Sequence, residues 1–108
     1  RLAEAEPLMR RALAIDEQSY GPEHPSVARD LNNLALLLQA INRFEEAEPL
    51  MRRCLCIFLE FTQRHHNSHP NLHAATCHYG DLLKQMGLSH EQVEVKLRKL
   101  GQEYGLEY

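Results

Sequence analysis

The residues best suited to chemistry gather in one histidine-rich stretch, residues 65–78. His69, His73 and Cys77 recur at intervals of four, so on a helix they would share one face. Two side chains spaced in this way can grip one zinc or nickel ion. All three cannot, because the first and third would stand about 12 Å apart along the helix axis. We therefore expect adventitious metal binding here, and keep a metal-binding regulatory element centred on this stretch as the alternative function.

Catalytic chemistry finds less support in the sequence. Cys77 lies close to His73 and His78, but no oxyanion hole or orienting group can be identified for such a pair. The chain also contains neither a CxxC pair nor an HExxH motif, the common signatures of zinc sites. The sequence predicts neither an enzyme nor a bound cofactor.

These side chains stand on a chain that repeats itself. The segment RLAEAEPLMRRALAI at residues 1–15 returns as RFEEAEPLMRRCLCI at residues 43–57, with eleven of fifteen positions identical at an offset of 42 (43 − 1). A period between about 20 and 50 residues is typical of solenoid proteins. Apolar residues of the first copy follow the 3.6-residue period of an amphipathic helix. The repeated unit is therefore expected to be helical.

The composition indicates which kinds of partner the protein can bind and in which cellular compartment it is expected. The 108 residues carry a formal charge of −3 and gather no basic stripe, which argues against binding to nucleic acid. The longest apolar run is too short to cross a bilayer, so we expect no membrane span. Cys54, Cys56 and Cys77 lack a disulfide spacing, which favours a reducing compartment. We expect a cytoplasmic protein.

Periodicity and turn residues predict about five helices, over residues 2–19, 25–40, 44–64 and 70–86, with a fifth after Ser89. Gly21 and Gly87 are expected to end helices, and Ser89 to cap the last one. The predicted buried side of the second helix carries Val27, Leu31, Leu34, Ala35 and Leu38.

Small and apolar residues at fixed places in these helices follow the pattern of a known family. The matching residues are Leu34, Ala35, Leu38, Ala47 and Met51 in one unit, and Tyr79, Gly80 and Leu83 in the next. The chain therefore resembles tetratricopeptide repeats. The 42-residue period and the phrases GPEHPSVARDLNNLALL and EAEPLMRRALAI are similar to the kinesin light chain subclass, in the style of its bacterial arrays.

The resemblance implies an all-α fold, a right-handed α-solenoid of antiparallel helix pairs in one domain over residues 1–108. Residues 1–20 would be helix B of a truncated repeat, residues 25–66 a complete repeat, and residues 70–108 a divergent, capping repeat. It also implies a non-enzymatic scaffold. A concave groove lined by the A helices would bind a peptide or a helical segment of a partner protein.

The expected groove is one face of each A helix. Asn33 stands where peptide-binding members often carry an asparagine, whose amide can bind the backbone of a chain of any sequence. Arg29 would add recognition of a carboxylate. The expected groove residues are Arg29, Asn32, Asn33, Leu36, Gln39 and Ala40 on the first A helix, and Ala74, Cys77, His78, Asp81 and Lys84 on the second.

The opening helix has no A-helix partner of its own in this sequence. A bare apolar face of this kind rarely stays exposed on a monomer, so we expect a homo-oligomer formed through this helix. The side chains concerned are Leu2, Ala5, Leu8, Met9 and Ala12.

Overall fold

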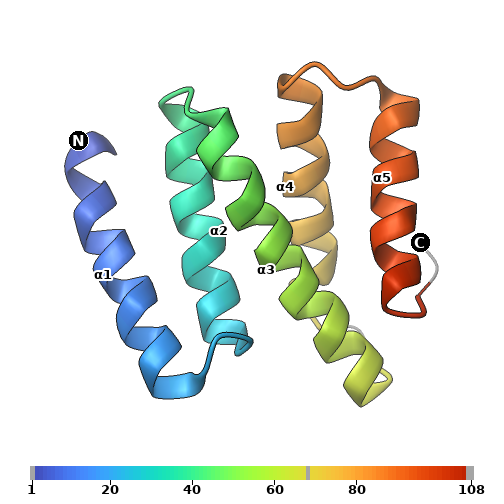
Figure 1. Ribbon diagram of the computed structural model, residues 1–108, viewed down its shortest axis with the longest axis horizontal. Coiled ribbons are helices and arrows are strands. Elements are labelled where there is room, and N and C mark those ends of the chain that lie inside the picture. The colour runs from blue at the N-terminus through green and yellow to red at the C-terminus, as the bar shows by residue number, and fades with distance from the viewer. Residues whose placement is uncertain (1, 68, 107–108) are drawn as a thin grey trace.

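The computed structural model describes residues 2–67 and 69–106, with the side chains of all of these except residues 2 and 3. This part of the chain forms helices and no strand (Figure 1). The helices are α1 (Leu2–Tyr20), α2 (Pro25–Ala40), α3 (Phe44–His65), α4 (Leu72–Gln85) and α5 (His90–Glu103). The prediction of an all-α helical-repeat fold with about five helices is confirmed. Only the start of the fourth helix was placed too early, at residue 70 instead of Leu72.

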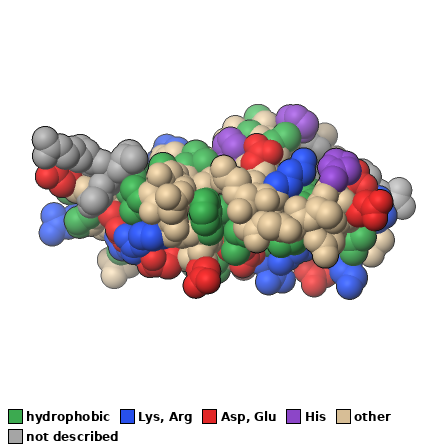
Figure 2. All heavy atoms as spheres, turned by 90° about the horizontal axis from the view of Figure 1, so that it is seen from above, with side chains coloured by type: hydrophobic (Ala, Val, Ile, Leu, Met, Phe, Trp, Pro, Cys, Tyr) green, Lys and Arg blue, Asp and Glu red, His purple; other side chains and the backbone are tan. Residues whose placement is uncertain are grey.

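Successive helices run antiparallel, and each packs mainly on the next one in the chain. In Figure 1, α3 crosses diagonally in front of α2 and α4, while α1 and α5 stand at opposite ends of the row. The principal extents are 38 × 34 × 18 Å, so the molecule is a slab. Figure 2 shows this slab edge-on, with many of its acidic and basic side chains along the lower side of the view.

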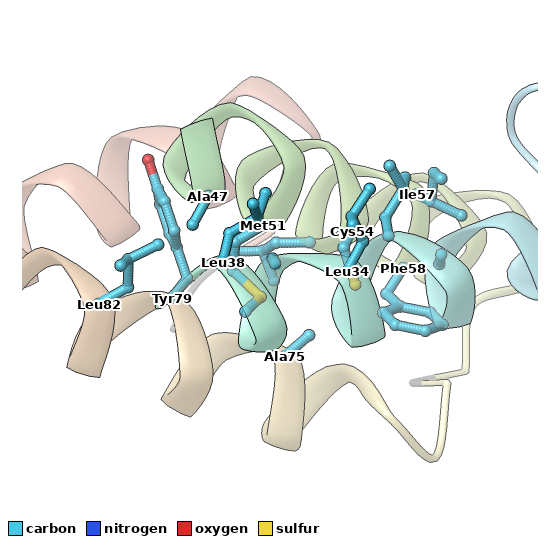
Figure 3. Close-up of a cluster of buried hydrophobic side chains, with 14 of the residues drawn as sticks. Leu34, Leu38, Ala47, Met51, Cys54, Ile57, Phe58, Ala75, Tyr79 and Leu82 are labelled. Carbon is cyan, nitrogen blue, oxygen red and sulfur yellow. The ribbon is translucent and has the colours of Figure 1, made fainter. Parts of the chain in front are cut away.

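The core lies where α2, α3 and α4 meet. Leu34 and Leu38 of α2 interleave with Met51 and Cys54 of α3, and Tyr79 enters from α4 (Figure 3). The helical period places these side chains on inward faces, which is why the predicted buried side of α2 is confirmed. Its members Val27, Leu31, Leu34, Ala35 and Leu38 are fully buried.

The turns between helices follow from a few special residues. Gly21 and Gly87 have φ angles of 91° and 103°, which favour glycine, and they follow α1 and α4 as predicted. Asn42 ends α2 with a φ of 62°, and its short polar side chain makes that conformation tolerable. Ser89 caps α5 as predicted. Its Oγ accepts from the N–H of Gln92 at 3.2 Å, and the Gln92 side chain accepts from the N–H of Ser89 at 2.8 Å.

The outer face of α1 is bare, as predicted. Leu8 exposes 67% of its surface and Ala12 is also exposed. Ile15, one turn further along the same face, exposes 54%. Of the other expected members, Ala5 and Met9 are half-buried against the core, and the side chain of Leu2 lies outside the described residues.

Candidate functional site

Two hydrogen bonds join α2 to α4 across the predicted groove. His78 Nδ1 lies 2.9 Å from Oδ1 of Asn32, and in the tautomer that is protonated at Nδ1 it donates to that oxygen. Towards the other end of the two helices, Gln39 Nε2 donates to Oε1 of Gln85. Gln85 was missed from the sequence, although it directly follows Lys84, an expected member of the groove.

A cavity of about 170 Å³ opens beside the Asn32–His78 contact, and we name it the groove cavity. The buried side chains of Phe58 and Ala75, which are labelled in Figure 3, give it an apolar floor. Arg29 and Asn71 add polar groups to its rim. The cavity thus brings together four of the expected groove residues, namely Arg29, Asn32, Ala74 and His78.

The remaining expected groove residues lie outside the groove cavity on the same two helices. Leu36 on α2 exposes 37% of its surface. Gln39 is half-buried. The other members are exposed: Asn33 and Ala40 on α2, and Cys77, Asp81 and Lys84 on α4.

Arg29 lies near two carboxylates, a contact that was not predicted. Its Nη2 lies 3.8 Å from Oδ2 of Asp16 on α1, and its Nε lies 3.8 Å from Oδ1 of Asp30. Asp30 is only 8% exposed, and its Oδ2 has no hydrogen-bond partner among the described residues. Burial and the nearby Asp16 carboxyl raise the pKa of Asp30 to about 6, while the charge of Arg29 opposes this. A carboxylate on a ligand would therefore compete with both aspartates for Arg29.

The histidine-rich stretch does not assemble as the helical spacing predicted. His69 precedes α4, and its Nδ1 accepts from the N–H of Asn71 at 3.0 Å. Its ring packs on Phe58 and Phe61, with centroids 4.5 and 4.8 Å away, and burial lowers its pKa. His73 and Cys77 do meet, with Nε2 and Sγ 3.6 Å apart. Within the described ranges, no group of three or more His, Cys, Asp or Glu side chains is placed to hold a metal ion.

The role of His69 has a counterpart in the preceding repeat. His24 also stands directly before a proline, and its Nδ1 accepts from the N–H of Ser26, again at 3.0 Å. Because a ring nitrogen accepts only when it carries no proton, both histidines act in this contact as neutral side chains. The repeated His–Pro pairs are thus structural turn elements.

Comparison with known proteins agrees with this architecture. A model of the tetratricopeptide repeat family matches residues 1–60, which is more than half of the chain. None of the curated proteins compared with the chain matches it. In the part of the chain that the structure describes, no helix is long and apolar enough to cross a membrane.

Proposed function

We propose, because the chain belongs to the tetratricopeptide repeat family, that it is a non-enzymatic scaffold for protein–protein interaction. Repeats of this family generally mediate such interactions. The ligand is an extended peptide or short helix of a partner protein, and it lies in the groove between α2 and α4. The 42-residue offset between the two copies supports membership of the kinesin light chain-like subclass. The cysteines form no disulfide among the described residues, which supports a location in the cytoplasm.

The groove cavity is the observation that carries this function. Its apolar floor accepts one apolar side chain of the ligand, because Phe58 and Ala75 offer contact without a polar group. Asn32 and His78 stand at the rim, where an amide and an imidazole can bind the ligand backbone. The expected ligand therefore has one apolar anchor and no requirement for a terminal carboxylate, since Arg29 is already engaged by Asp16 and Asp30.

Selection from a random peptide library on the immobilised chain tests the proposal. Ala74→Trp fills the groove cavity and is expected to lower the affinity for the selected peptides by at least about tenfold. Ala14→Trp is the matched control, because Ala14 is also exposed but lies on α1, away from the cavity. Peptides that bind both variants as tightly as the unaltered chain would remove the groove cavity as the site.

Self-association is the second part of this proposal. The bare face of α1, made of Leu8, Ala12 and Ile15, packs on the same face of a second copy. In an antiparallel pair Leu8 lies opposite Ile15 of the other copy, with the small Ala12 near the centre, where two helices can approach closely. Sedimentation equilibrium should show a dimer that Leu8→Glu abolishes. A monomer at millimolar concentration would refute the pairing.

The metal-binding alternative is not carried forward. Among the described residues the stretch supplies only the close pair of His73 and Cys77, and His69 is occupied at the turn before α4. A pair of ligands at i, i+4 fits the adventitious binding expected from the sequence.

A further inference from the structure

A second, larger cavity lies away from the groove, and it does not depend on the function proposed above. It has a volume of about 490 Å³ and is lined by the link between α1 and α2 and by the C-terminal half of α3. Figure 1 shows both of these segments in its lower part. This volume falls within the range of about 300–1,000 Å³ that is usual for ligand pockets. Because aromatic and imidazole rings stand on both of its walls, we name it the ring-lined pocket; these rings belong to Tyr20, His24, Phe61 and His65.

The rings form two contacting pairs, one stacked and one tilted. On the link, Tyr20 and His24 stack with centroids 4.6 Å apart and planes 22° apart. On α3, Phe61 and His65 lie with centroids 4.2 Å apart and planes 39° apart. Tyr20 exposes 57% of its surface, so its stacking on His24 leaves much of a large ring in water. An exposed aromatic ring offers a ligand a large apolar contact area.

The wall formed by the link is fixed before any ligand arrives. Arg53 Nη2 donates to Oε2 of Glu17 at 2.6 Å and to the carbonyl oxygen of Pro22 at 3.1 Å, so α3 holds the link in place. The contact from Ser26 N–H to His24 Nδ1 orients the imidazole ring. A preformed wall lowers the entropic cost of binding.

The charged residues that line the pocket favour a basic ligand. Arg64 donates to Glu60, so these two lining residues neutralise each other. Glu23 lines the pocket too, is exposed, and makes no ion pair with any described residue. The pocket therefore offers a ligand one free carboxylate, which complements a basic side chain.

We infer that the ring-lined pocket binds a proline-rich segment of a partner protein in the polyproline II conformation, with an arginine or lysine placed against Glu23. Proline rings pack well on aromatic faces, and a polyproline II segment loses little entropy on binding because it is already extended. Its carbonyl groups make no hydrogen bonds within the segment, so they are free to accept from the Tyr20 hydroxyl.

Fluorescence anisotropy with a labelled octapeptide, APPPRPPA, tests this inference. We expect saturable binding that is lost with the octapeptide AAAARAAA and weakened with APPPEPPA, since the first removes the prolines and the second repels Glu23. Tyr20→Ala should weaken binding about tenfold, and Glu23→Lys about fivefold at low ionic strength. Both side chains are exposed, so both variants should fold, and circular dichroism checks that they do.

The control variant is Val95→Ala, which removes an exposed apolar side chain from α5 and should leave binding of APPPRPPA unchanged. Amide chemical shifts should move at Gly21 and Glu23 when the peptide is added. Equal binding of APPPRPPA and AAAARAAA, or binding that Tyr20→Ala leaves intact, would overturn the inference. Neither result would bear on the groove cavity, because the two sites share no lining residue.

Discussion

Ile15 and Ile57 occupy the same place in two copies of one helical sequence, 42 residues apart (57 − 15), yet Ile15 is 54% exposed and Ile57 is 4% exposed. The difference comes from neighbours: α3 packs on both α2 and α4, whereas α1 packs mainly on α2. Burial in this chain is thus set by the position of a helix in the row as well as by its amphipathic pattern.

This pair gives a direct test of the packing. Ile57→Ala should lower the free energy of unfolding by about 2–5 kcal/mol, because it empties a packed site. Ile15→Ala, the same substitution on the bare face of α1, should cost no more than about 1 kcal/mol in the monomer. Urea unfolding of dilute protein measures both changes. Equal costs would show that α1 is covered in solution.

Gly80 allows a stabilising substitution. A Cβ atom built at this position would lie 3.6 Å from Cγ1 of Val93 and 3.8 Å from Cδ1 of Leu97, which is ordinary contact. Gly80→Ala should therefore stabilise the protein by about 0.5–1 kcal/mol, since alanine is the better helix former. Gly87→Ala is the contrasting variant and should destabilise, because Gly87 has a φ of 103°. Thermal unfolding of the two variants should give shifts of opposite sign.

Asp30 should make stability depend on pH. Its pKa is raised from 3.8 to about 6 in the folded protein, so between these values the folded state binds more protons than the unfolded chain. The contribution of Asp30 to stability should therefore fall as pH rises through this window and stay low above it. Asp30→Asn should raise the free energy of unfolding at pH 7 by about 1–3 kcal/mol and flatten the dependence. Asp81→Asn, on an exposed carboxylate, is the control.

The contribution of the α5 capping box to stability should also be measurable. Ser89→Ala removes the acceptor for the Gln92 N–H and should cost about 1 kcal/mol. Amide exchange at Gln92 and Val93 should accelerate, because these groups lie in the first turn. Ser19→Ala, an exposed position within α1, should change stability by less than about 0.5 kcal/mol. Unchanged exchange at Gln92 would mean that the cap contributes nothing.

The helices and the core could be predicted because they depend on local patterns. The bounds of α2 follow from Pro25 at its start and from the 3.6-residue period that ends near Ala40. The prediction that His69 shares a helix face with His73 and Cys77 was wrong, because the i, i+4 spacing needs a helix that includes His69, whereas α4 begins at Leu72. An i, i+4 spacing places two side chains on one face only when both residues lie in the same helix.

The groove cavity could be predicted only in part, because its lining residues come from different helices. The face of α2 with Asn32 and the face of α4 with His78 were both expected, since each follows from helical period. Phe58 was missed as the floor because it comes from the supporting helix α3. The closeness of the Asp16 and Asp30 carboxyl groups was missed because it depends on how α1 packs on α2.

The row of helices also determines how the molecule should come apart. Because each helix rests mainly on its neighbours in the chain, loss of α1 or α5 uncovers one face and leaves the remaining contacts intact. Unfolding should therefore proceed inward from the two ends, and amide protons of α2 and α3 should be the last to exchange. A peptide held between α2 and α4 would therefore contact one of the two helices that unfold last.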